Sequence, residues 1–335
     1  MYKKILLITL LIVVIVVTCV FVCLQLNKEN SRAKTDLIIS YYNNPKIPEG
    51  FHTVDTETAK WTKMDDGVIR DWNKGLVIED ENGNQFVWIP VDKEDIFYDI
   101  EEIEEEFQYK PDALNMQNND EKQILKYGGF YISRYEAGVP TELQDRLNEI
   151  NSDSNDLRGV PVSKKGIIPW NYISLRNAKL NAESMYNNEY YSSDLPTLKQ
   201  MMQIIEWLNK SGYNIYDSSE YGNYSNVNFE FTGYYSIDYG KNYKYGKNIQ
   251  KAGYNMILST GATNRNITNN IYDLAGNLWE YTDDYLSRDE NEIAGYYCVG
   301  GHYDHTGDHF PIYSHNLKNV APLDKVGFRI VLNLE

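Results

Sequence analysis

Histidines and aspartates gather near the C-terminus in a pattern that could hold a metal ion. Four of the chain's five histidines fall in one stretch with two aspartates; the residues are His302, Asp304, His305, Asp308, His309 and His315. Imidazole and carboxylate ligands can hold zinc, iron or copper and leave a position open for substrate. A metal-dependent enzyme of the oxidase or hydrolase type, with His302, His305 and His309 as ligands, is one hypothesis. The favoured alternative is that these side chains face solvent or a binding partner.

The same window supports a binding hypothesis. It is rich in amphipathic side chains that form hydrogen bonds, and the candidate surface residues are Tyr303, Asp304, Asp308, Tyr313, His315 and Asn316. Such residues are typical of adaptable binding surfaces, because tyrosine gives a large contact area at low entropic cost. The expected partner is a protein or a small-molecule ligand.

A second candidate metal site lies earlier in the chain, in the block from Asp273 to Glu280. Calcium takes six to eight oxygens from carboxylates and from the backbone carbonyls of a tight loop. Asp273 and Glu280 can supply carboxylates, and Gly276 lets the chain turn between them. The alternative is that Asp273 caps the turn and Glu280 pairs with an arginine such as Arg329.

Charge and cysteine content limit the classes of partner and of stabilisation. The net charge is −16, which disfavours nucleic acid and anionic lipid headgroups as partners. Cys298 is the only cysteine outside the apolar N-terminal run. A disulfide within the domain is therefore impossible, and the hydrophobic core must provide the stability.

The N-terminus predicts a membrane anchor. Residues 5–26 are almost all apolar and follow Lys3 and Lys4. About twenty apolar residues span the hydrocarbon core of a bilayer, and no small-residue cleavage site is evident. We expect a single-pass anchor with the N-terminus inside, a polar stalk over 27–70, and one extracytoplasmic domain over 71–335.

Local patterns indicate the elements that must position these residues. An Asn82-Gly83 turn between apolar runs predicts a hairpin over 75–90, and residues 128–138 are typical of a strand. Apolar residues at three- and four-residue steps predict helices over 174–186, with Ser174 as cap, and 197–209. Residues 211–248 predict long loops with short strands, 141–165 an exposed insertion, and the acidic run 95–106 a solvated segment. The expectation is one α+β domain with two helices.

Several short blocks, in order, resemble the formylglycine-generating enzyme family, also called the sulfatase-modifying factor domain. They are Val87–Pro90, Phe130–Glu136, Ile168–Asn171, Leu195–Thr197, Asn270–Tyr281 and Gly327–Arg329. The resemblance covers about residues 84–333. It implies a loop-rich fold similar to a C-type lectin domain, with short antiparallel strands. The family's Glu-Ala-Glu-Trp-Glu continuation is missing after Thr197, where Leu198-Lys199-Gln200 stands.

The resemblance also carries expectations about chemistry. Members of the family oxidise a substrate cysteine to formylglycine with copper held by two cysteines, and the matching positions here are His305 and Phe310. Because the thiolate pair that selects Cu(I) is absent, copper and the family reaction are not expected. The resemblance implies calcium binding through Asp273, Glu280 and the carbonyls of Gly276 and Leu278.

The expected function is therefore a membrane-anchored, extracytoplasmic, non-catalytic domain that binds a ligand through its C-terminal surface. The C-terminal window also resembles that of lectin-like proteins diversified by retroelements. That hypothesis predicts a near-copy of the coding stretch and a reverse transcriptase gene nearby. The rivals are the metal-dependent enzyme described above and a purely structural envelope protein.

Overall fold

The structure is a computed structural model that describes residues 45–54, 74–91, 118–149, 158–289, 292–318 and 323–335. Pro45–Glu335 forms one compact unit. The expected anchor over 5–26 and the acidic run 95–106 lie outside the described residues. No helix within the described ranges is long and apolar enough to cross a membrane.

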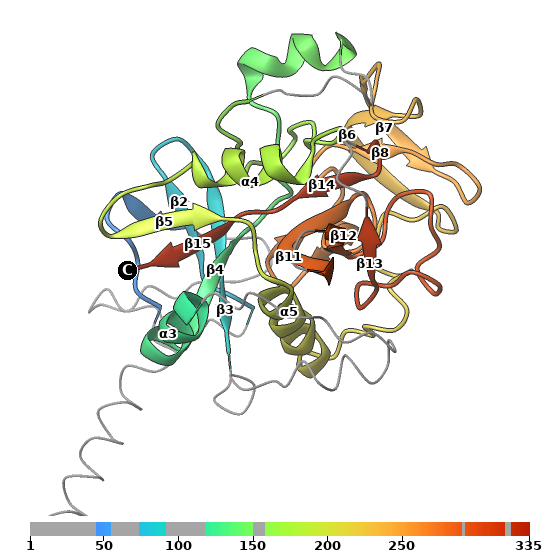
Figure 1. Cartoon of the computed structure of the whole chain (residues 1–335). Coiled ribbons are helices and arrows are strands. Elements are labelled where there is room, and N and C mark those ends of the chain that lie inside the picture. Colours follow the sequence, from blue (N-terminus) through green and yellow to red (C-terminus); the bar gives the residue numbers. More distant parts are fainter. Residues whose placement is uncertain (1–44, 55–73, 92–117, 150–157, 290–291, 319–322) are drawn as a thin grey trace, which may run out of the picture. The chain divides into compact units, whose positions relative to one another are not determined.

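A six-stranded sheet brings distant parts of the chain together in the order β1-β2-β3-β4-β15-β5, with every neighbouring pair antiparallel. The strands are β1 (Phe51–Thr53), β2 (Val77–Asp80), β3 (Gln85–Pro90), β4 (Gly129–Ser133), β5 (Tyr191–Asp194) and β15 (Val331–Leu334). Figure 1 shows β15, at the chain's end, beside β4 and β5. Part of the expected stalk, β1, therefore belongs to the domain.

The hairpin of β2 and β3 confirms the predicted turn. Gly83 has a φ of 84°, a conformation that glycine adopts without strain. Asp80 stabilises the turn from its start, because its Oδ1 accepts hydrogen bonds from the backbone N–H groups of Asn82 (2.9 Å) and Asn84 (2.7 Å). These contacts lie within four residues of the chain, which is why the sequence could predict the turn.

Both predicted helices are present, as α4 (Leu175–Glu183) and α5 (Leu198–Lys210). Ser174 caps α4 by accepting from the Asn177 N–H at 3.3 Å. A capping box starts α5, in which the Thr197 and Gln200 side chains accept from each other's backbone N–H groups at 3.2 and 2.9 Å. Gln200 thus gives the unusual continuation after Thr197 a structural role. The helix α3 (Asn118–Tyr127) and the 3₁₀ helices η2 (Thr141–Glu149) and η3 (Asn264–Asn266) were not predicted.

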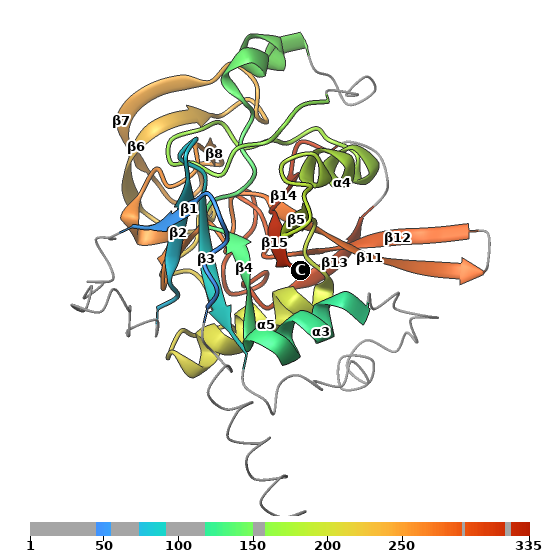
Figure 2. The same cartoon turned by 90° about the vertical axis from the view of Figure 1, so that its left-hand side faces the viewer.

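Two further sheets form the C-terminal half (Figure 2). One has the order β13-β12-β11-β14 and contains β11 (Trp279–Asp289), β12 (Glu292–Val299), β13 (His315–Lys318) and β14 (Val326–Phe328). The other has the order β7-β6-β8, with β6 (Phe229–Ser236), β7 (Lys244–Gln250) and β8 (Ile257–Leu258). β9 (Ile267–Thr268) and β10 (Ile271–Tyr272) form a small pair. Long strands over 229–250 correct the expectation of loops with short strands there.

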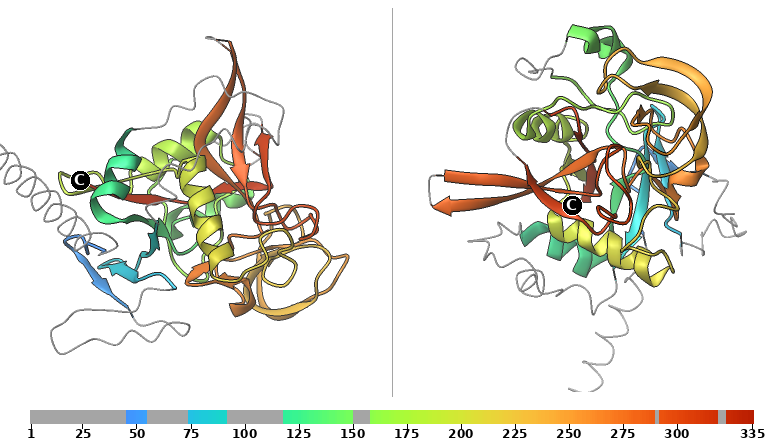
Figure 3. Two further views of the ribbon diagram at one scale, coloured as in Figure 1. Left: turned by 90° about the horizontal axis from the view of Figure 1, so that it is seen from below. Right: turned by 90° about the vertical axis from the view of Figure 1, so that its right-hand side faces the viewer.

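Long hairpins and irregular segments position the site. Figure 3 shows β11 and β12 as a hairpin that extends past the neighbouring strands. β11 also pairs in parallel with β14, which brings Gly327 opposite Glu280. The described residues form a mostly antiparallel, loop-rich α+β domain with few helices, as expected.

One tertiary contact at the start of α5 makes stability depend on pH. Asp284 of β11 accepts from the Leu198 N–H at 2.5 Å, and burial raises the pKa of Asp284 to about 6. An unfolded aspartate has a pKa near ~3.9, so the stabilisation is complete below that pH and is lost as pH rises through about 6.

We therefore expect wild type to lose stability relative to Asp284→Asn as the pH rises from about 4 to about 7, by roughly 3 kcal/mol. Asparagine keeps an acceptor for Leu198 but does not ionise. Urea unfolding at several pH values measures the difference between the two proteins. Asp145→Asn, at an exposed position, is the control, and a pH-independent difference for Asp284→Asn would contradict the prediction.

Candidate functional site

Three ring side chains from the C-terminal window stack on one another between β12 and β13. The His302 and His305 ring centroids lie 3.5 Å apart at 28°, and those of His305 and Phe310 lie 3.8 Å apart at 15°. Trp279, the fully buried first residue of β11, meets His305 edge-on at 5.6 Å. We call His302, His305 and Phe310 the ring stack.

Backbone turns hold the ring stack in place. Gly301 has a φ of 73°, and a Cβ there would lie 2.5 Å from the Phe310 carbonyl oxygen. The buried Tyr224 hydroxyl donates to the carbonyls of Gly300 (3.1 Å) and Phe310 (2.9 Å). The Gly300-Gly301 pair therefore allows the chain to fold back closely enough for His305 to reach Phe310.

The stack does not present a metal site formed by His302, His305 and His309. Imidazole lone pairs lie in the ring plane, so two rings stacked face to face direct them side by side and not toward one ion. His309 is exposed and contacts Thr306 and Asp308. Across the parts of the chain that the structure describes, no three His, Cys, Asp or Glu side chains are grouped so as to hold a metal ion.

The predicted binding residues divide between core and surface. Tyr303 is 2% exposed and donates to Asp324 at 3.2 Å, and Asp304 pairs with Lys325 at 2.7 Å. His315 is half-buried, with its ring 6.2 Å from that of Tyr297.

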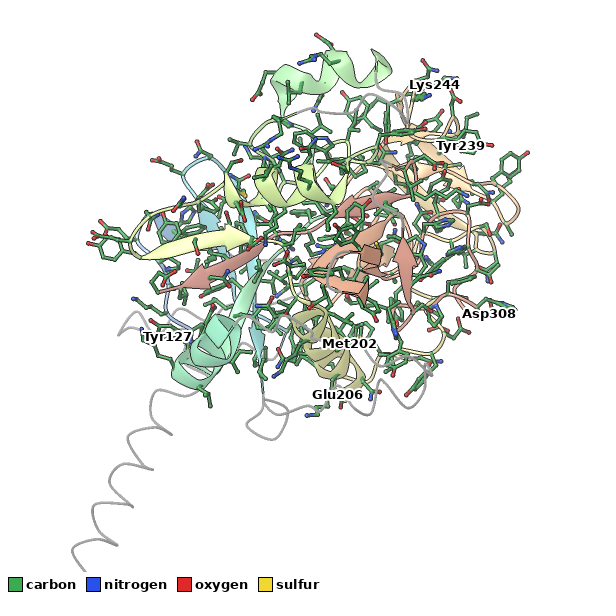
Figure 4. All side chains as sticks on the ribbon, in the orientation of Figure 1. Tyr127, Met202, Glu206, Tyr239, Lys244 and Asp308 are labelled. Atoms are coloured by element: carbon green, nitrogen blue, oxygen red, sulfur yellow. The ribbon has the colours of Figure 1, made fainter. Side chains whose placement is uncertain are left out.

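A tyrosine from outside the window, Tyr216, lies beside its exposed part and was not singled out by the sequence analysis. The Tyr313 ring lies 5.4 Å from that of Tyr216, which is 66% exposed. Asp308 is an outward-facing member of this surface (Figure 4). We call five of the exposed or half-buried residues the C-terminal face: Tyr216, Asp308, His309, Tyr313 and Asn316.

Glu280 pairs with an arginine, as one of the two sequence hypotheses proposed. Arg329 is fully buried, and its Nη2 lies 2.6 Å from Glu280 Oε1 while its Nε donates to both carboxylate oxygens. The guanidinium also donates to the carbonyls of Ser133 and Tyr272, both at 2.9 Å. Such a charge pair persists in a protein core only when its hydrogen bonds are satisfied.

Two further buried carboxylates lie in the same region. Asp273 accepts from the Gly261 N–H at 2.7 Å and from Asn266 Nδ2 at 3.4 Å, and burial raises its pKa to about 6. Glu136 accepts from Asn277 Nδ2 at 2.5 Å. Burial, and then the neighbouring carboxylates, raise the pKa of Glu136 well above its ordinary value.

Arg134 does not form an ion pair with Glu136, which lies two residues further along the same segment. Arg134 instead donates to the Asn270 carbonyl and to the Gln85 side chain, at 3.0 and 2.8 Å. Nothing in the local sequence indicates that Glu136 and Asn277, 141 residues apart, would meet.

The carboxylates of the Asp273–Glu280 loop do not fit a calcium site as they are arranged. Calcium needs free oxygens that converge on one point. Both Glu280 oxygens accept from Arg329, and both Asp273 oxygens accept from Gly261 and Asn266. The predicted ligation by Asp273, Gly276, Leu278 and Glu280 stays a prediction; unfolding midpoints with calcium and with a chelator would test it.

Residues 129–334 match the model of the family described as the sulfatase-modifying factor enzyme 1-like domain. This match spans more than half of the chain. The chain belongs to this family. The family assignment that the short sequence blocks predicted is therefore confirmed.

Solved structures that the chain matches have low sequence identity to this member of the family. CarF is 15% identical over 62% of this chain and 87% of its own, with a TM-score of 0.39. Treponema denticola variable protein 1 is 14% identical over 62% and 85%, with a TM-score of 0.37. PvdO from Pseudomonas aeruginosa is 17% identical over 78% and 98%, with a TM-score of 0.41. A comparison with curated proteins gives no match.

Proposed function

We propose that this member of the sulfatase-modifying factor enzyme 1-like family is a binding module that does not generate formylglycine. One observation carries the proposal: His305 and Phe310, which match the positions of the copper-binding cysteines in family enzymes, stack face to face at 3.8 Å. An imidazole against a phenyl ring cannot replace two thiolates as ligands of Cu(I).

The described residues offer no thiol that could take over the chemistry. Cys298 is fully buried in β12, where it lies opposite Tyr281 of β11. A thiolate is the form that reacts and binds metals, and apolar burial disfavours it. This supports a role without the family's cysteine oxidation.

The C-terminal face is the surface that we assign to ligand binding. It combines aromatic rings from Tyr216 and Tyr313 with the polar groups of Asp308, His309 and Asn316. Rigid aromatic rings beside adaptable hydrogen-bonding groups suit a protein or small-molecule ligand. The proposal includes the anchor over 5–26, which would hold the domain at the outer surface of a membrane and rests on the sequence alone.

A copper-loading assay tests the catalytic half of the proposal. The purified protein, supplied with Cu(I), oxygen and a cysteine-containing peptide, should leave the peptide thiol unchanged by mass spectrometry. The double variant His305→Cys, Phe310→Cys should gain stoichiometric copper, measured by elemental analysis, because the two positions are adjacent. Conversion of the peptide by wild type would overturn the proposal.

Glycan and peptide arrays test the binding half. We expect ligands found with wild type to bind at least about tenfold more weakly to Tyr313→Ala, since a central aromatic contact often contributes 2 kcal/mol or more. Tyr190→Ala removes a tyrosine that is 54% exposed on a different part of the domain and is the matched control. Equal binding by both variants would show that the C-terminal face is not the site.

A further inference from the structure

The strand β7 is an open edge of its sheet. In the order β7-β6-β8 it pairs only with β6, and Figure 2 shows it as the outermost strand of that sheet. In the described parts of the chain, its residues form no backbone–backbone hydrogen bonds outside this sheet. A strand with a free edge can accept another strand, because alternate N–H and C=O groups point outward.

Exposed apolar side chains are concentrated around this edge. Eleven large apolar residues are exposed in the described ranges, and six of them lie between residues 234 and 254: Tyr234, Ile237, Tyr239, Tyr245, Ile249 and Tyr254. Tyr245 is 68% exposed and its ring meets that of Tyr234 across the pair of strands at 5.1 Å. Tyr239 and Lys244 point outward in Figure 4. Exposed apolar residues that are gathered in one place, and not scattered singly, are typical of an interaction surface.

The same segment is basic within an acidic protein. Residues 229–256 contain four lysines and two acidic residues, a net charge of +2 (4 − 2), whereas the whole chain carries −16. Lys244, Lys247 and Lys251 are exposed and form no ion pair within the described residues. The local charge therefore favours an anionic partner.

Lysines on an edge strand also have a protective role, since they discourage other strands from adding. Protection alone does not require exposed aromatic and aliphatic side chains between the lysines, as in Lys244-Tyr245 and Lys247-Asn248-Ile249. Lysines that repel basic strands, and that are costly to bury against apolar ones, also attract an acidic strand. We propose that β7 is a docking edge for an extended, acidic segment of a partner protein, which pairs with the β7 backbone. On one face of the added strand, its side chains would meet Tyr245, Lys247 and Ile249, and on the other face a carboxylate would meet Lys244.

Fluorescence anisotropy with a labelled eight-residue peptide, Glu-Glu-Val-Val-Glu-Glu-Val-Val, tests this proposal, because each face of that strand carries both carboxylates and apolar side chains. We expect saturable binding that weakens at high salt, and no binding of the matching lysine–valine peptide. N-methylation of two adjacent central residues removes one N–H from each edge of the peptide and should abolish binding. If the methylated peptide binds equally well, the contact is only electrostatic and the proposal fails.

Variants of the protein test whether the peptide binds at β7. Lys247→Glu should weaken peptide binding about tenfold or more, because it turns attraction into repulsion. Lys46→Glu makes the same change of net charge at an exposed position outside this sheet and should have little effect. Tyr313→Ala should bind the peptide like wild type, so the outcome is separate from that of the proposed C-terminal face.

Three other results would overturn the proposal: no peptide binding, equal weakening by Lys247→Glu and Lys46→Glu, or a concentration-dependent dimer that Lys247→Glu abolishes without any peptide binding. The last would assign the edge to a second copy of the chain. Unchanged unfolding midpoints of the variants confirm that the fold is intact.

Discussion

Arg329→Met is expected to lower the free energy of unfolding by about 3–5 kcal/mol, enough to unfold many domains of this size. The substitution leaves the buried Glu280 carboxylate without the guanidinium that lies 2.6 Å away. It also leaves the Ser133 and Tyr272 carbonyls without their donor. Urea unfolding followed by tryptophan fluorescence measures the loss.

A double-mutant cycle separates the charge from the packing. Adding Glu280→Gln to Arg329→Met should restore part of the stability, because a neutral amide costs less to bury than an unpaired carboxylate. Arg176→Met, at an exposed position of α4, is the matched control and should change stability by less than about 0.5 kcal/mol. A loss below about 1 kcal/mol for Arg329→Met would contradict the inference that the pair is a structural centre of the domain.

Gly276→Ala should be the second most damaging change, with an expected loss of about 3–5 kcal/mol from strain and overpacking together. Gly276 has a φ of 71°, and a Cβ there would lie 2.2 Å from the Asn223 carbonyl oxygen. The same oxygen accepts from the Asn277 N–H at 3.0 Å, and the Gly276 N–H donates to Gly300 at 2.7 Å. Moving this backbone would disturb the turn that precedes Trp279.

Gly253→Ala distinguishes the two components of that loss. Gly253 has a similar φ of 88°, but a Cβ there would meet no atom within 4 Å. It should cost only the conformational strain, about 1 kcal/mol. Thermal unfolding of both variants gives the comparison, and equal losses would show that the close approach of Asn223 and Gly276 is unimportant.

The sequence predicted those elements whose causes lie within a few residues. Asn82-Gly83 closes a hairpin by turn conformation, and Thr197 with Gln200 starts α5 by reciprocal hydrogen bonds. The strands over 229–250 were missed because β7, an open edge with little buried surface, lacks the apolar alternation that identifies a half-buried strand. Backbone pairing with β6, and not burial of an apolar face, holds β7 as a strand.

In the candidate site, too, some features followed from the sequence and others only from the tertiary structure. The order of the short blocks determined the family. The spacing of the blocks predicted that His305 and Phe310 stand where family enzymes have their copper-binding cysteines, and this stays a prediction. Only the tertiary structure placed His305 on Phe310 and moved Tyr303 into the core.

By itself, the sequence determined the family and the two principal helices, since these depend on residue identity and local spacing. Tertiary structure decided that Glu280 meets Arg329, that Glu136 meets Asn277, and which face of the C-terminal window reaches solvent. A partner 49 or 141 residues away is selected by packing and by the cost of burying an unpaired charge, and neither can be evaluated before the chain is folded.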